Sequence, residues 1–396
     1  MAMHNTSVLI LGGGFAGVKT ARQLSKTPGI NITLVSNDDT FRYGATIWRA
    51  ATGFLKQDSY IPLKQLLPNN VELIQDSATS IDRSKKTVTL ASKKTIKYDF
   101  CVIGLGVVTS YFGIKGLEEF SYSVKTHKEF KAFRQHLHQE LIDEKSLDKN
   151  YVVVGAGPTG VELAAALKGY LKQVAIHHKV RSKKVNMELI EAAPRILPTL
   201  SSVASKRALR HLQKLGVSVR TKTTVKGETK NTINIGDKII PTHTVIWTAG
   251  VTCNPFFINN PKQFALNQRK KVIVDGYLRV GDNTFVVGDS ASTPYSGLAL
   301  TALHNASYVA KYIQRTIQKK SVKPYRPLKP ITIVPVGEGW SIFEWRKLVI
   351  TGRLASIMRS IYDYVGYSKI MDSKKAFNIW LRRDERSEDC LFCKEL

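Results

Sequence analysis

The sequence has few cysteines and no long apolar run. Its 396 residues include only four cysteines, too few and too scattered for a disulfide scaffold, so we expect a reducing, cytoplasmic setting. No stretch approaches the roughly 18 consecutive apolar residues that a membrane-spanning helix needs. The N-terminus also lacks the pattern of a secretion signal, because its apolar run leads directly into glycines at Gly12. We therefore expect a soluble or peripheral protein.

Acidic residues are also scarce. The chain has 31 Asp and Glu against 59 Lys and Arg, which gives a formal net charge of +28. Such a charge favours binding to anionic polymers or membranes, so nucleic acid and lipid headgroups are both possible targets, but it does not inform on the fold. The 43% hydrophobic and 23% charged residues are typical of a globular protein, and the length exceeds one hydrophobic core, which predicts two or three domains.

Glycines occur where a dinucleotide-binding turn needs them. Residues Ser7–Leu11 form a short apolar run typical of a buried parallel strand, and Val18–Leu24 follow with helical periodicity. Between them stand Gly12, Gly14 and Gly17, spaced as Gly-x-Gly-x-x-Gly. In this motif the first glycine allows the tight turn, the second lets the backbone approach a pyrophosphate, and the third permits close helix packing.

The same pattern recurs later in the chain. A second β-branched run, Tyr151–Val154, leads into the glycine-rich stretch Gly155–Gly160 and the helical pattern of Val161–Leu167. An ordinary strand-to-helix turn explains either motif alone, but two copies in full strand and helix context are hard to obtain by chance. We therefore predict an α/β fold with two Rossmann-like dinucleotide-binding domains.

The residues that end the second strand of each unit indicate how the ribose is held. In the second unit Val185–Ile190 ends in Glu191, a carboxylate that accepts from the 2′-hydroxyl and repels a 2′-phosphate, so NADH is favoured over NADPH. The nearby Arg195 leaves NADPH open. In the first unit the strand ends in Ser36 instead of an acid.

A third element indicates which of the two glycine motifs binds which nucleotide. The stretch Asn283–Asp289 is a strand that ends in Gly-Asp, far along the chain from the first motif. In flavoproteins with two dinucleotide sites, such a strand returns to the first domain and its Asp contacts the ribityl-phosphate side of the flavin. Although a plain strand-to-turn Gly-Asp remains the alternative, we predict FAD at the first site and NADH at the second.

At this point the sequence resembles the pyridine-nucleotide-dependent flavin oxidoreductases, and most closely the type II NADH dehydrogenases that reduce membrane quinone. The stretches that carry the resemblance are Gly12–Gly17, Tyr98–Gly106, Phe112–Leu117, Gly155–Glu162, Trp247–Val251 and Val287–Asp289. It implies an FAD domain at 1–112 and 250–325, an inserted NADH domain at 113–249 and a small C-terminal membrane or dimer element at 326–396.

The resemblance also implies site residues. FAD would contact Gly12, Gly14, Phe15, Ala16, Gly17, Ser36, Gly106, Asp289, Ala299 and Leu300. NADH would contact Gly155, Gly157, Thr159, Gly160, Glu191 and Gly250. Glu162 would lie near the meeting point of nicotinamide and flavin, although an acid in a first helical turn is also favoured by the helix dipole alone. No metal site is expected.

The sequence departs from its relatives in two places. No cysteine pair occurs in Phe41–Trp48, which disfavours disulfide reduction, and Cys101 and Cys253 look like inert thiols. The quinone-reducing family usually carries two glutamines where this chain has Leu300 and His304. His304 is a catalytic candidate that would donate to a quinone carbonyl, with a structural histidine as the alternative. Near the end, the pair Cys390 and Cys393 supplies only two of the four ligands of a structural zinc.

The C-terminal region has the pattern of a basic amphipathic helix. An apolar stripe at helical spacing is formed by Leu354, Ile357, Met358, Ile361 and Val365, and interfacial aromatics are expected at Tyr362, Tyr364 and Tyr367. Nine Lys or Arg and only two acids lie between Trp345 and Arg383. We expect this helix to lie in an anionic headgroup layer; packing on the flavin domain or on a partner in a homodimer is the alternative.

Together these observations predict a peripheral oxidoreductase at the cytoplasmic face of the cell membrane. It would transfer hydride from NADH to FAD and then pass electrons to a respiratory quinone, without pumping protons. A first rival uses oxygen, ferredoxin or another soluble acceptor, which the missing glutamines favour. A second rival is a flavoprotein that binds nucleic acid or a protein partner under NADH control, but the charge comes without a recognisable binding motif, so nucleic acid is not expected.

Overall fold

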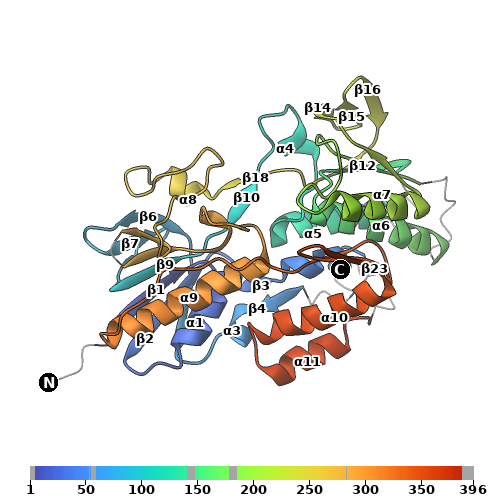
Figure 1. The fold of residues 1–396 in the computed structure, drawn as a ribbon. Helices are drawn as coiled ribbons and strands as arrows, with labels where there is room; N and C mark the ends of the chain where they lie inside the picture. The colour runs from blue at the N-terminus through green and yellow to red at the C-terminus, as the bar shows by residue number, and fades with distance from the viewer. Residues whose placement is uncertain are drawn as a thin grey trace.

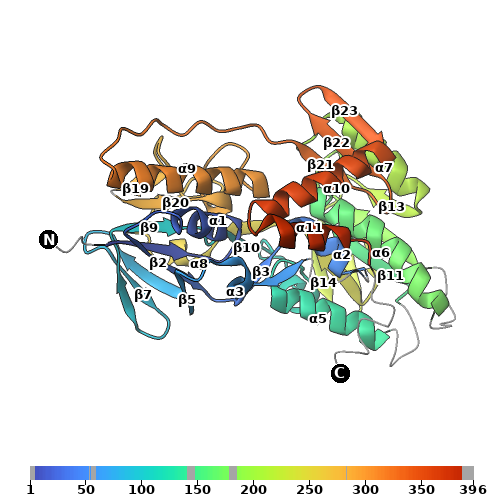
Figure 2. The same ribbon diagram turned by 90° about the horizontal axis from the view of Figure 1, so that it is seen from below.

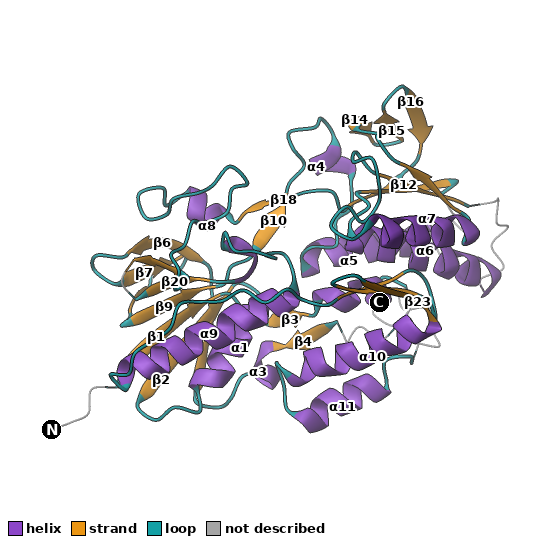
Figure 3. Cartoon of the chain, viewed as in Figure 1, coloured by secondary structure: helices purple, strands orange, loops and turns teal. Residues whose placement is uncertain are grey.

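Two parallel sheets organise the molecule. The computed structural model describes residues 5–52, 54, 59–140, 148–177, 185–281 and 283–385. Each parallel sheet lies in its own half of the structure, with helices packed against it (Figures 1 and 3). The α/β fold class predicted from the two glycine motifs is therefore confirmed.

The first sheet has six strands. Their order is β19 (Arg279–Gly281), β20 (Thr284–Val286), β9 (Phe100–Ile103), β1 (Thr6–Leu11), β2 (Ile30–Ser36) and β5 (Val71–Gln75). All neighbours are parallel except the edge pair β19–β20. Strands β9 and β20 are buried along their whole length, as expected when both faces of a parallel sheet are covered. Because β20 joins this sheet, the Gly-Asp motif returns to the first unit as predicted.

The second sheet has four strands, all parallel. Their order is β13 (Val217–Arg220), β12 (Asn186–Ile190), β11 (Asn150–Val154) and β17 (Thr244–Trp247). The helices of this half are α4 (Leu117–Phe120), α5 (His127–His138), α6 (Pro158–His177) and α7 (Ser202–Lys214). In the first half α1 (Phe15–Leu24) packs against α9 (Ala299–Ile317). Each glycine motif therefore lies between a central strand and the helix that follows it.

Short elements connect and extend the two sheets. Strands β10 (Val107–Thr109) and β18 (Val251–Cys253) pair antiparallel where the chain passes between the two halves. The other antiparallel strands are β3 (Thr40–Arg42), β4 (Tyr60–Pro62), β6 (Ala78–Asp82), β7 (Thr87–Leu90), β8 (Thr95–Lys97), β14 (Val225–Thr229), β15 (Thr232–Ile235) and β16 (Lys238–Pro241). The remaining short helices are η1 (Gly44–Thr46), α2 (Ile47–Ala50), α3 (Leu63–Leu66), α8 (Pro255–Ile258) and η4 (Gly288–Ser290).

The C-terminal region folds back onto both halves. It contains β21 (Thr332–Pro335), β22 (Ser341–Trp345), β23 (Leu348–Gly352), α10 (Arg353–Ser368) and α11 (Ser373–Leu381). Figure 2 shows a long connection that leads from α9 to β21, so that α10 and α11 lie side by side next to the junction of the two halves. The three strands pack between α10 and the helices α6 and α7. Within the described ranges, no helix combines the length and the apolar character needed to cross a bilayer.

Candidate functional site: one cavity between two glycine turns

The first glycine turn is dictated by close backbone contacts. Gly12 has a φ of +106°, and a Cβ added there would lie 2.5 Å from the carbonyl oxygen of Gly104. A Cβ at Gly17 would collide with the carbonyl oxygen of Gly12, whereas a Cβ at Gly14 would meet no atom within 4 Å. The chain therefore needs glycine at positions 12 and 17 to fold, and position 14 leaves open space beside the N-terminus of α1. Unsatisfied N–H groups in the first turn of a helix, with open space beside them, suit an anion such as a diphosphate.

A single large cavity begins at this turn and reaches the second half. Its volume is about 680 Å³, within the range of roughly 300–1,000 Å³ typical of ligand sites. All of the residues predicted to contact FAD line it except Gly17, namely Gly12, Gly14, Phe15, Ala16, Ser36, Gly106, Asp289, Ala299 and Leu300. From the predicted NADH set, Thr159 and Gly250 line it, while Gly155, Gly157, Gly160 and Glu191 lie outside its lining.

Hydrogen bonds hold the polar residues of the first half in place. The carboxylate of Asp289 accepts from the N–H of Gly297 at 3.1 Å. The next residue, Ser290, donates its hydroxyl to the carbonyl of Gly106 at 2.8 Å. Ser36 ends β2 beside the cavity and is buried, at the position where the sequence pattern led us to expect a ribose contact. These residues form a fixed polar wall that fits a dinucleotide.

The second glycine turn repeats the geometry of the first. Gly155 has a φ of +99°, a Cβ at Gly160 would collide with the carbonyl oxygen of Gly155, and a Cβ at Gly157 would meet no atom within 4 Å. Gly250 has a different constraint, since a Cβ there would lie 2.5 Å from the carbonyl oxygen of Ser110, where the crossing strands β10 and β18 meet. The second turn therefore has the same shape for a diphosphate.

Glu191 contacts the backbone of its own turn. Its carboxylate accepts from the N–H of Ala156 at 2.7 Å and from the N–H of Ala193 at 2.8 Å. Arg195, which left NADPH open in the sequence, donates instead to three backbone carbonyls, those of Leu197, Pro198 and Leu200. The acid therefore shapes the turn, and the guanidinium is already engaged by main-chain oxygens.

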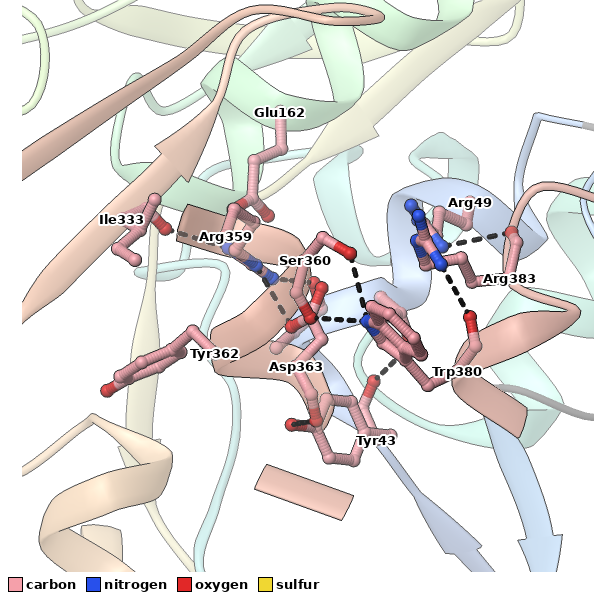
Figure 4. Close-up of polar contacts among 12 residues, drawn as sticks. Tyr43, Arg49, Glu162, Ile333, Arg359, Ser360, Tyr362, Asp363, Trp380 and Arg383 are labelled. Carbon is pink, nitrogen blue, oxygen red and sulfur yellow. Dashed lines mark hydrogen bonds and ion pairs between the residues drawn. The ribbon is translucent and has the colours of Figure 1, made fainter. Parts of the chain in front are cut away.

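Glu162 lies in the cavity wall within a buried charge cluster (Figure 4). It extends from α6 toward Arg359 of α10, and 3.5 Å separate its Oε1 from Nη1 of the arginine. Arg359 binds Asp363 more closely, with 3.0 Å from Nε to Oδ1, and it also donates to the carbonyls of Ile333 and Ala45. Burial raises the pKa of Glu162 to about 8 although Arg359 opposes the shift.

The cluster joins three parts of the chain at the cavity. Glu162 and Asp363 share the single positive charge of Arg359. If both carboxylates were ionised, the buried cluster would carry a net negative charge, so a proton on Glu162 is favoured near neutral pH. The sequence singled out Glu162 but missed Arg359 and Asp363 as site residues. Their i,i+4 spacing on the face of α10 away from the apolar stripe was the available signal.

His304 lies outside the lining of the cavity. It sits on α9, and its Nδ1 is 3.0 Å from the hydroxyl of Tyr325. Burial lowers its pKa, so the neutral ring is favoured. The position of His304 therefore does not support the proposed role in donating to a quinone. Leu300, the other departure from the quinone-reducing pattern, does line the cavity.

Two basic residues that the sequence analysis missed also line the cavity. Arg42 ends β3, and Lys125 immediately precedes the N-cap of α5. Neither position belongs to a recognisable motif, and a single Lys or Arg in a polar stretch carries no sequence signal. Cys101 and Cys253 are buried, and burial raises the pKa of both thiols, in line with the inert thiols expected. Cys390 and Cys393 lie outside the described residues.

The exposed face of α10 carries the predicted apolar stripe in part. Four of its five members are exposed, namely Leu354, Ile357, Ile361 and Val365. Met358 packs inward, against the cluster formed by Ile333, Phe343 and Ala355. Phe377 and Leu381 of α11, and Trp345 and Leu348 at the turn between β22 and β23, are also exposed.

The prediction of interfacial tyrosines is wrong for Tyr367, and it stays a prediction for Tyr362 and Tyr364, which are half-buried. Tyr367 is buried and stacks on Tyr43 at 4.2 Å between ring centroids, and Tyr362 lines the cavity. Tyr364 packs against Phe377 and Trp380 of α11. Tyr367 faces the protein because its ring attaches α10 to the first half through Tyr43, and a tyrosine suits either setting because it combines an apolar ring with a polar hydroxyl.

Comparisons with known proteins place this chain among flavin and nicotinamide enzymes. The family described as Pyridine nucleotide-disulphide oxidoreductase matches residues 6–308. The Type II NADH:quinone oxidoreductase of Staphylococcus aureus (strain MSSA476) is 27% identical, covering 93% of this chain and 97% of the relative.

Solved structures share the fold along almost the whole chain. NDH2 from Plasmodium falciparum in complex with NADH has a TM-score of 0.83 at 17% identity, covering 96% of this chain and 97% of that one. The sulfide:quinone oxidoreductase from Aquifex aeolicus has a TM-score of 0.79 at 24% identity and covers 98% of each chain.

Proposed function

Because the chain belongs to the pyridine nucleotide-disulphide oxidoreductase family, we propose that it is an FAD-dependent NADH dehydrogenase that passes electrons to a membrane quinone. The observation that carries this proposal is a cavity of about 680 Å³ that is lined by the first glycine turn and extends to Thr159 of the second, together with the matching geometry of the two turns. The relatives named as type II NADH:quinone oxidoreductases match this chain over nearly its full length, which supports the same pair of substrates.

The two halves would hold the two coenzymes. We assign residues 1–112 and 250–325 to FAD, with the diphosphate at Gly14 and Asp289 on the ribityl side. We assign residues 113–249 to NADH, with its diphosphate at Gly157 and the nicotinamide directed past Thr159 toward Glu162. When bound, FAD accepts hydride from NADH and returns the electrons to a second acceptor.

The chain's own residues orient these groups and control protons. The two glycine turns fix the diphosphates, so the reactive rings are directed to the junction of the halves. The buried Glu162, with its pKa raised to about 8, holds a proton at the cavity near neutral pH. A carboxyl group of this kind is suited to deliver a proton when a quinone is reduced to a quinol.

An absorption experiment tests the proposal. Purified protein is reconstituted with FAD, its spectrum is recorded before and after anaerobic NADH, and a short-chain quinone or oxygen is then added. We expect bleaching of the flavin by NADH and fast recovery with the quinone. Protein that takes up no flavin would refute the proposal. Recovery only with oxygen or a soluble carrier would instead make this an NADH oxidase or a reductase of that carrier, as the replaced glutamines at 300 and 304 suggested.

We further propose that the exposed face of α10 and α11 docks on an anionic membrane, at the cytoplasmic face of the cell. Exposed apolar side chains such as Ile357 and Ile361 lie on α10, and basic residues flank them at Arg353, Lys369, Lys374 and Lys375. This combination binds headgroups through apolar burial and charge together. A quinone from the membrane would then reach the cavity from the α10 side, where Tyr362 lines it.

Co-sedimentation with vesicles tests the docking. We expect binding to phosphatidylglycerol vesicles that Ile361→Asp weakens by about tenfold. The control Ile239→Asp changes an equally exposed isoleucine on β16, and its binding should equal that of the unaltered protein. If Ile361→Asp instead dissociates a dimer in sedimentation analysis without changing vesicle binding, the stripe is a homodimer interface. Salt-sensitive binding to DNA without vesicle binding would favour the nucleic-acid rival.

A further inference from the structure

Two basic side chains that line the cavity, Arg42 and Lys125, form no ion pair with a described carboxylate, although acids lie farther away. The guanidinium of Arg42 donates to the carbonyl of Val124 at 3.0 Å. In the part of the chain that the structure describes, no carboxylate lies within 4.0 Å of Arg42 or of the Lys125 ammonium. Both residues are half-buried beside the cavity, so their charges lose part of their hydration without gaining a close acidic partner. The cavity is also lined by acids such as Asp289 and Glu162, but neither of them forms an ion pair with these two cations, so the two cations are free to face a negative charge on an occupant.

The two cations gather at the junction of the halves. The residues on either side of Arg42, Phe41 in β3 and Tyr43 just after it, pack against Phe15 at the start of α1. Because side chains alternate along a strand, Arg42 points the other way and reaches Val124. Lys125 stands just before the helix α5 of the second half. This is the side of the cavity where the second half meets the first.

The diphosphate already has its own binding elements. The glycine turn and the first-turn N–H groups of α1 serve it in the first half. In an enzyme with two dinucleotides, the rings meet where the halves face each other. The cations at the junction are thus placed to interact with a negative charge on the flavin ring rather than with the phosphates.

Building on the proposed function, we infer that Lys125, supported by Arg42, supplies the positive charge that stabilises the flavin ring after it receives hydride. Hydride transfer moves two electrons and one proton from NADH to the ring, so NADH leaves as NAD⁺ and the flavin becomes more negative by one unit. A nearby fixed cation favours this product and raises the reduction potential of the flavin.

The charges around Lys125 are consistent with this role. Burial lowers the pKa of Lys125, and Arg42 and Lys271 lower it further, whereas Asp289 and Glu129 raise it. A negative charge appearing on the ring would act in the same direction as the two acids. The reduced enzyme should therefore hold the proton on Lys125 more tightly than the oxidised enzyme.

The test measures the flavin reduction potential of the FAD-loaded protein against a reference dye. For Lys125→Met we expect the equilibrium constant for reduction to fall by about tenfold, which is about 30 mV for a two-electron couple. Lys125→Arg keeps the charge and should restore the potential. Lys128→Met removes an exposed lysine three residues away and should leave it unchanged.

A measurement of FAD affinity in the same variants gives the result that would contradict the inference. If Lys125→Met binds FAD more weakly by tenfold or more but keeps the potential, the cations hold the diphosphate and the inference is wrong. An unchanged potential with unchanged affinity also overturns it. If Lys125→Met retains no FAD, Arg42→Met is measured in its place: its reduction potential should also fall, and an unchanged potential would refute the inference. Failure of the proposed function is distinct, because the unaltered protein would then take up no FAD.

Discussion

Replacing Glu162 by Gln should stabilise the protein, by an amount that grows with pH. Burial raises the pKa of this carboxyl from the ordinary 4.5 to about 8. Between these values the unfolded chain carries the charge and the folded protein holds a proton, so raising the pH favours unfolding. A shift of this size corresponds to about 5 kcal/mol once the pH exceeds the folded pKa. Glutamine has nearly the same shape as glutamate but cannot ionise, so the variant does not have this free-energy cost.

The assay is urea unfolding followed by circular dichroism at several pH values. The difference in unfolding free energy between Glu162→Gln and the unaltered protein should be small at about pH 5 and reach several kcal/mol at about pH 8.5. Glu119→Gln changes an exposed carboxyl on α4 and should alter stability by less than about 0.5 kcal/mol at each pH. A gain that stays constant across the pH range would refute the reasoning, because it would mean that Glu162 is ionised throughout.

Three further predictions concern the turns and the acceptor side. Gly14→Ala should weaken FAD binding by roughly tenfold, about 1.4 kcal/mol, with an unchanged circular dichroism spectrum, while the equally unobstructed Gly169→Ala on α6 should not; equal FAD affinity in both variants would contradict this. Glu191→Ala frees the N–H groups of Ala156 and Ala193, so the KM for NADH should rise by about tenfold with little change in kcat, and a KM within twofold would argue against it. His304→Ala should leave kcat/KM for a short-chain quinone within about twofold while costing about 1 kcal/mol of stability, and a large loss of quinone activity alone would restore this residue to the site.

Local sequence patterns predicted the elements that depend on the backbone. The third glycine of each turn follows from a local contact, such as the approach of Gly17 to Gly12, whereas Gly12 and Gly155 are also constrained by Gly104 and Ala249 of distant segments. The buried strands follow from continuous apolar runs, since a parallel sheet covered on both faces needs such runs. The apolar run before the Gly-Asp motif forms β20, which is buried in the first sheet for the same reason, although the strand ends at Val286 and Asp289 lies in η4.

Periodicity failed where both faces of one helix carry apolar side chains. On α10 the exposed stripe was predicted, but Met358 and Tyr367 turned inward. The pattern alone gives the spacing of side chains around a helix and not which face meets the protein. His304 is a similar case, because it lies on the face of α9 that contacts Tyr325 and not on the face that lines the cavity.

By itself, the sequence determined two dinucleotide turns, the strands that carry them and a basic C-terminal helix, because each depends on residues that are neighbours in the chain. Only the tertiary structure decided that Arg359 of α10 stands beside Glu162 of α6 and that Arg42 and Lys125 face one cavity. The members of each pair lie far apart in sequence, and their charges interact strongly only when folding excludes water and brings them to the same site.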